Sequence, residues 1–142
     1  MTQLIHVTRA YGTPVSGEII VFQEGFSPRY DLDRVTGIIS RRGHSSEGQS
    51  LKDKIVVIPT AKGGVAGGWA FADMVYKGFA PKALVFGRLN PVMVQGAIFA
   101  KLTITEGWSP DALTLLRTGD TVEVDPQRRM ITRIAKGVLP CP

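Results

Sequence analysis

The sequence predicts a strand-rich α/β fold in one domain that covers residues 1–142. Three observations support this prediction: several runs rich in β-branched residues, a glycine-rich turn that leads from the most apolar run into a helical pattern, and a final pair of strand-like runs around a turn. A domain of 142 residues buries about 68–70% of the surface of its unfolded chain, and 44% of the residues are hydrophobic. Such a domain builds a core without disulfides or metals. The chain contains no internal repeat, linker or shift in composition.

The first half of the chain alternates strand-like and polar segments. Residues 15–22 (VSGEIIVF) are expected to form an early strand, and 23–36 are polar and irregular. Residues 37–40 are a short strand candidate. Residues 41–50 contain no large apolar side chain and are expected to form a surface loop. The clearest strand covers 54–59, whose unbroken run of Ile and Val indicates burial on both faces of a sheet.

A glycine-rich turn follows at residues 60–68 (TAKGGVAGG) and leads into a predicted helix over 69–77. Apolar residues recur there at helical spacing, and Gly78 suits the end of the helix. Residues 82–86 are expected to form another buried strand, and 92–100 form a small apolar segment.

The last part of the chain again favours strands. Residues 102–104 are a strand candidate, and 109–116 fit a short helix with a serine cap followed by proline. Residues 121–124 and 130–134 predict a hairpin. Residues 138–142 are expected to be a frayed tail.

Charge and composition argue against several classes of protein. The net charge is +5, and the basic clusters at 41–42 and 128–133 contain no aromatic residues, so a solvated surface is favoured over nucleic-acid binding. No apolar run approaches the ~20 residues of a membrane span, and the N-terminal residues do not resemble a signal peptide. The single cysteine, Cys141, cannot hold an iron–sulfur cluster, which takes several thiolates. We expect a cytoplasmic protein with no membrane partner, no nucleic-acid partner and no metal site of its own.

The glycine-rich turn is the most informative candidate site. A turn between a buried strand and a helix directs backbone N–H groups and the positive end of the helix dipole toward one spot, which favours a carboxylate or phosphate. Lys62 adds a positive charge there. The pattern matches neither the dinucleotide fingerprint nor the P-loop. The same glycines also fit a tight turn with close packing of helix on sheet, so both interpretations stand.

Residues 41–50 contain side chains that acid–base or nucleophilic catalysis uses, namely His44, Ser45, Ser46, Glu47 and Ser50. Composition does not supply geometry, and a solvated loop is the favoured interpretation. His6 lies in an apolar stretch and is expected to be structural. Asp31 and Asp33 are expected to cap a turn.

Three motifs in a fixed order carry a resemblance to a known family. Residues 33–37 (DRVTG) resemble Asp-Pro-x-Thr-Gly, 44–50 (HSSEGQS) resemble His-Pro-x-x-Gly-x-Ser, and 60–68 resemble Ser-Gly-Arg-Gly-Ser-Ser-x-Gly-Ser. These are motifs of the small subunit, or swivelling domain, of the aconitase X enzymes. The similarity spans most of residues 15–135.

The resemblance implies a swivelling β/β/α barrel-like domain that closes over a larger subunit. In that family the large subunit carries an iron–sulfur cluster or iron and most substrate contacts, while the small subunit binds no cofactor. Members dehydrate small hydroxy acids such as phosphomevalonate and cis-3-hydroxyproline. The resemblance therefore implies a lyase subunit that is active only in a heteromer with its large partner.

One departure from the family pattern concerns the reaction itself. The family's serine after Arg-Gly in the glycine-rich turn removes the substrate proton, and here that position is Gly64. Lys62 replaces the arginine, which keeps the charge but loses the bidentate fork. The expected site residues are Thr60 and Lys62 for catalysis and Gly63, Gly64, Val65, His44 and Ser50 for substrate binding.

Two functions follow. The leading hypothesis is the small subunit of an aconitase X-like hydro-lyase that dehydrates a small hydroxy carboxylic acid and supplies an anion-binding turn. The alternative is a non-catalytic or regulatory binding module that kept the fold and lost the catalytic serine at Gly64.

Overall fold

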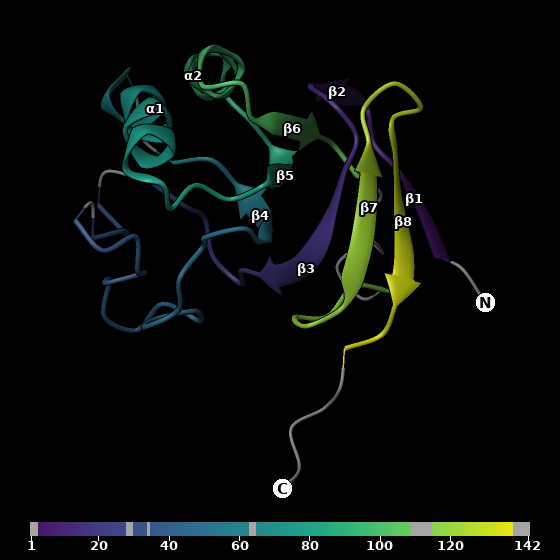
Figure 1. The fold of residues 1–142 in the computed structure, drawn as a ribbon, viewed down its shortest axis with the longest axis horizontal. Helices are drawn as coiled ribbons and strands as arrows, with labels where there is room; N and C mark the ends of the chain where they lie inside the picture. The colour runs from purple at the N-terminus through teal and green to yellow at the C-terminus, as the bar shows by residue number, and fades with distance from the viewer. Residues whose placement is uncertain (1–2, 28–29, 34, 63–64, 109–114, 138–142) are drawn as a thin grey trace, which may run out of the picture.

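The computed structural model describes residues 3–27, 30–33, 35–62, 65–108 and 115–137 (Figure 1). In these residues eight strands form one sheet and are accompanied by two helices. The elements in chain order are β1 (Gln3–His6), β2 (Arg9–Tyr11), β3 (Val15–Val21), β4 (Ile55–Thr60), α1 (Val65–Lys77), β5 (Ala83–Arg88), α2 (Pro91–Phe99), β6 (Thr103–Glu106), β7 (Thr121–Asp125) and β8 (Met130–Ala135).

The sheet has the strand order β1-β8-β7-β3-β4-β5-β6-β2. Its centre, from β3 to β6, is parallel, and the strands at both ends are antiparallel. β3 joins the two parts because residues 15–18 pair with β7 and residues 19–21 pair with β4. Figure 1 shows β4, β5 and β6 on one side of β3 and β7, β8 and β1 on the other. The strand-rich α/β class is confirmed.

The position of β4 between two hydrophobic clusters explains why its sequence is apolar without interruption. Val56 and Ile58 pack into one hydrophobic cluster, together with residues of α1 and α2. Ile55 and Val57 face the opposite side and pack into a second cluster with residues of β7 and β8. The predicted burial on both faces is confirmed, and it anchors the segment that follows β4 at its carboxyl end.

The two helices pack against each other beside the central strands (Figure 1). α1 ends as predicted, since Gly78 has a φ of 84°. It begins at Val65, four residues earlier than predicted, so residues 67 and 68 belong to its first turn rather than to a loop. The apolar segment predicted at 92–100 is α2, which the Asn90 side chain caps by accepting a hydrogen bond from Met93 N.

Several other segments differ from expectation. Residues 37–40 form only isolated bridges, Leu32 with Ile39 and Ile38 with Ser50, because tight turns on both sides prevent a longer ladder. The edge strands β1 and β2 were not predicted. The hairpin is confirmed as β7 and β8. Most of the predicted helix at 109–116, and the tail at 138–142, lie outside the described residues.

Candidate functional site

Lys62 lies just beyond β4, in a segment that the backbone holds in place. Phe26 N donates a hydrogen bond to Thr60 O, and Lys62 N donates one to Phe26 O. The approach is close: a Cβ added to Gly25 would lie 2.9 Å from Thr60 Cγ2. Only glycine leaves room for this packing. The β4 extension is therefore fixed against the polar segment that follows β3.

A buried carboxylate, Asp31, contacts Lys62 and a second cation, Arg41. Asp31 is fully buried, its Oδ1 accepts a hydrogen bond from Arg41 Nη1 at 2.9 Å, and its Oδ2 lies 3.8 Å from Lys62 Nζ. The two cationic side chains are 51% and 39% exposed, respectively. A buried carboxylate without partners is costly, so this pairing stabilises both the carboxylate and the positions of the two cations.

These groups surround a pocket of about 530 Å³. Its described lining consists of Ser27, Tyr30, Asp31, Arg41 and Lys62. The Ser27 amide donates to Asp31 Oδ2 at 2.9 Å, while the buried Ser27 hydroxyl has no hydrogen-bond partner among the residues that the structure describes. The pocket is thus lined by two half-exposed cations and one unused hydroxyl. The sequence indicated Lys62 but not Ser27 or Arg41, and it assigned Asp31 only to a turn.

The remaining residues of the predicted turn are placed to different degrees. Thr60 is partly buried, and its hydroxyl donates to Ala61 O at 3.5 Å. Gly63 and Gly64 lie outside the described residues, and Val65 is described only as the first residue of α1. The first turn of α1 contains no acidic residue that would offset the positive end of its dipole.

His44 is not a solvated loop residue, as the sequence had suggested, but a buried one. Its ring packs edge-to-face on Phe22 with centroids 4.6 Å apart, and its Nδ1 accepts a hydrogen bond from Ser46 N at 3.0 Å. The same Nδ1 lies 3.3 Å from Glu24 Oε1, and the buried Nε2 has no hydrogen-bond partner among the described residues. His44 does not line the Lys62 pocket; its contacts with Phe22 and Ser46 hold the loop in place.

Glu24 contacts this loop from the end of β3. Burial raises the pKa of Glu24, but hydrogen bonds from the Ser45 hydroxyl and amide and the nearby His44 ring outweigh it, so its pKa is below the usual value. Ser50, also predicted for substrate binding, accepts a hydrogen bond from Lys52 N and does not line the Lys62 pocket. The 44–50 motif thus stabilises its own loop.

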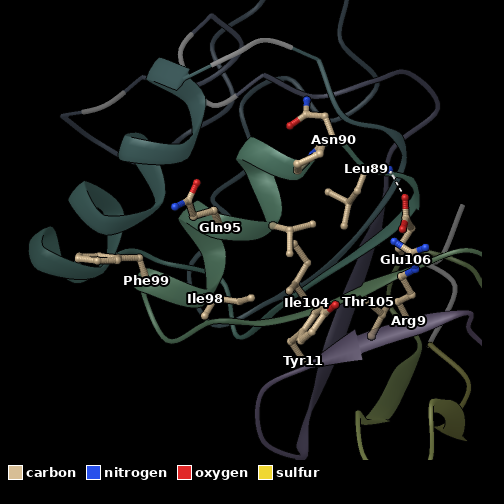
Figure 2. Close-up of a pocket in the computed structure, with 12 residues that line it drawn as sticks. Arg9, Tyr11, Leu89, Asn90, Gln95, Ile98, Phe99, Ile104, Thr105 and Glu106 are labelled. Carbon is tan, nitrogen blue, oxygen red and sulfur yellow. Dashed lines mark hydrogen bonds between the residues drawn. The ribbon is translucent and has the colours of Figure 1, made fainter.

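A second hollow of about 490 Å³ lies between α2 and the β2–β6 edge (Figure 2). Figure 2 shows Tyr11, Ile98 and Ile104 on its sides and, at one end, the hydrogen bond from Leu89 N to Glu106 Oε2, which measures 2.8 Å. Its lining is mainly apolar, and it includes none of the sequence-predicted site residues. The pocket at Lys62 is the one that combines buried charge with those residues.

The described residues contain neither a cluster of metal ligands nor a membrane-spanning helix. Within them, no group of three or more His, Cys, Asp and Glu side chains is arranged to hold a metal ion. Among the helices that the structure describes, none is long and apolar enough to cross a membrane.

Asp33 forms the predicted turn, since its Oδ1 accepts hydrogen bonds from Val35 N and Thr36 N, and these bonds lower its pKa.

Comparison with known proteins agrees with this fold. The chain is 31% identical over 113 residues to the phosphomevalonate dehydratase small subunit of Pyrococcus abyssi, covering 80% of this chain and 85% of that protein. It is 28% identical over 109 residues to the protein of the same name from Methanococcoides burtonii, covering 77% and 80%. These relatives are subunits of dehydratases, so the predicted class of enzyme, a hydro-lyase, is confirmed.

Solved structures agree as well. A crystal structure of Thermococcus kodakaraensis aconitase X in its holo-form superposes with a TM-score of 0.86 at 27% identity, covering 93% of this chain and 98% of that chain. A solution NMR structure of a UPF0107 protein gives 0.85 at 26% identity, covering 93% and 99%. The family described as the aconitase X swivel domain matches residues 4–133. The chain therefore belongs to the aconitase X swivel-domain family.

Proposed function

We propose that this chain is the small subunit of a two-subunit hydro-lyase that removes water from a small hydroxy carboxylic acid. The observation that carries the proposal is the position of Lys62: in a chain of this family, its side chain lines a pocket and lies three residues before the first residue of α1. Phosphomevalonate is the first substrate to test, because the curated relatives named above are subunits of phosphomevalonate dehydratase.

In this proposal the chain binds and orients the substrate. Lys62 binds an anionic group of the substrate, and the amides of Gly63, Gly64 and Val65 add donors at the positive end of α1. Thr60 is close enough in the chain to donate or accept one further hydrogen bond. His44 and Ser50 shape the neighbouring loop and do not contact the substrate.

Dehydration also needs a group that removes a proton from the carbon next to the carboxylate, while the hydroxyl leaves as water. Gly64 offers no side chain for this step. The remaining sources are Thr60, Lys62 and a residue of the large subunit. Any iron or iron–sulfur cluster belongs to the large subunit in this proposal, because one cysteine in residues 1–142 is too few thiolates for a cluster.

The test is a dehydration assay of the chain purified with its large subunit. We expect Lys62→Ala to lower kcat/KM by 10-fold or more, since it removes a charge-assisted contact to the substrate. Lys52→Ala is the matched control, because Lys52 is exposed and outside the pocket. Equal turnover by the wild type and Lys62→Ala, for every substrate that the complex accepts, would show that the site is wrongly placed.

Gly64 favours a second candidate, a binding module that kept the fold and lost catalysis. It predicts a stable complex with the large subunit and no dehydration of any hydroxy acid. In that case Gly64→Ser is the informative variant, because it adds a hydroxyl at this position. Dehydration by Gly64→Ser but not by the wild type would identify a site that has lost its base.

A further inference from the structure

We propose that Arg41, Lys62 and Ser27 form a subsite for the phosphate group of a phosphorylated substrate, with Asp31 as its positioning residue. The identity of that substrate rests on the proposed function, but the subsite itself does not. Its three donors come from three separate segments of the chain and line the same pocket.

The charge arrangement leaves the pocket positive. Arg41 and Lys62 share the single buried carboxylate of Asp31, so one positive charge is not balanced within this group of three. Both cationic side chains are partly exposed at the pocket, whereas the carboxylate is not. An anion that enters therefore meets the two cations before the carboxylate.

Hydrogen-bond donors also remain available. Within the described contacts, Arg41 uses only Nη1, so most of its guanidinium donors are unused. Lys62 Nζ lies 3.8 Å from Asp31 Oδ2, which is an ion-pair distance too long for a hydrogen bond. The Ser27 hydroxyl is buried and unpartnered, which a folded protein tolerates at few positions. Among the described residues, the other guanidinium nitrogens of Arg41, the Lys62 ammonium group and the Ser27 hydroxyl thus have no hydrogen-bond acceptor.

This set of donors fits phosphate better than a carboxylate. A phosphate monoester presents three terminal oxygens, one for each donor, whereas a carboxylate presents two. Arginine and lysine are the side chains that most often bind phosphate, the first as a fork and the second as a point charge. The volume of about 530 Å³ accommodates such a group together with the carbon chain that bears it.

Asp31 places both cations through its side chain and its backbone. Besides the contacts of its carboxylate, its carbonyl oxygen accepts hydrogen bonds from Ser40 N at 3.0 Å and Arg41 N at 3.4 Å. The segment that carries Arg41 is therefore held on Asp31 both by its backbone and by the Arg41 side chain. Asp31 does not touch the phosphate in this proposal; it keeps Arg41 beside Lys62.

The experiment is a titration of the isotope-labelled full chain with inorganic phosphate, followed by NMR. We expect saturable shifts in the amide signals of residues 26, 27, 30, 31, 41, 61 and 62, and about 10-fold weaker binding by Arg41→Gln and by Lys62→Gln. Arg42→Gln is the matched control, because it removes the neighbouring exposed arginine, and it is expected to change binding by less than 2-fold. Equal binding by the wild type and Arg41→Gln would overturn the subsite.

Asp31→Asn tests the positioning role. It is expected to weaken phosphate binding and to shift the signals of the segment around Arg41, whereas unchanged binding and signals would overturn that role. Should Asp31→Asn not fold, Ser40→Pro removes one backbone bond to Asp31 O and is expected to weaken binding in the same direction; equal binding would again overturn the role.

Activity separates this proposal from the proposed function. In the two-subunit complex, Arg41→Gln is expected to raise KM for phosphomevalonate about 10-fold with little change in kcat. Phosphate binding that depends on Arg41 in a complex without dehydratase activity would retain the subsite and reject the proposed function. Dehydratase activity on an unphosphorylated acid, with no phosphate binding by the chain, would retain the proposed function and reject the subsite.

Discussion

Asp31 is the residue on which the charge arrangement of the site depends. It is fully buried, and three groups compensate its charge: the Ser27 amide, Arg41 and Lys62. Its partners lie 4, 10 and 31 positions away in irregular segments. No periodic pattern links such positions, so the sequence indicated a turn for Asp31 and a solvated surface for Arg41. The place of Lys62 beside a recognisable strand was predictable because it lies in a turn between two recognisable elements, whereas its role stays a prediction.

Glu24 carries a prediction of pH dependence. Its folded-state pKa is lowered from 4.5, so the carboxylate stabilises the fold fully above the unfolded-state value and loses this contribution as pH falls through the lower folded-state value. Glu24→Gln is expected to lower Tm by about 1–4 °C at pH 7 and by progressively less below pH 4.5. Thermal unfolding from pH 7 to 3 measures this, with the exposed Glu123→Gln as control. A Tm difference that grows toward acid pH would contradict it.

At the scale of elements, the predictable segments are those whose pattern is local. β4 was recognisable from four consecutive β-branched residues, and the end of α1 from Gly78. β1 and β2 are short edge strands, and their partners lie about 100 residues or more away, in β8 and β6. Their pairing is set by the closure of the whole sheet, which the residues of each strand do not encode by themselves.

Gly37 allows a prediction about the turn formed by the 33–37 motif. Its φ is 77°, and an added Cβ would lie 2.5 Å from the Phe79 ring. Gly37→Ala is expected to lower the free energy of unfolding by about 2–4 kcal/mol, from left-handed backbone strain and steric overlap together. Gly43→Ala is the matched control, because Gly43 has a φ of 82° and open space around it. Only left-handed backbone strain then lowers its free energy of unfolding, by about 1–2 kcal/mol. Equal losses in urea unfolding would disprove the contact with Phe79.

At the scale of the whole molecule, the two sides of the sheet have different relations to the site. The Lys62 pocket lies at the carboxyl end of β4, where the segment after β3 is hydrogen-bonded to residues 60–62. The antiparallel strands β7, β8 and β1 extend the sheet on the other side of β3 and supply the second hydrophobic cluster (Figure 1).

The most direct test of the central claim is dehydration by the reconstituted complex, followed by ¹H NMR with phosphomevalonate as substrate. The account predicts that the substrate signals decline and those of an unsaturated acid appear, only when both subunits are present, and that Lys62→Ala slows the reaction 10-fold or more while Lys52→Ala does not. A complete complex that forms no unsaturated product from phosphomevalonate or any other hydroxy acid would contradict it.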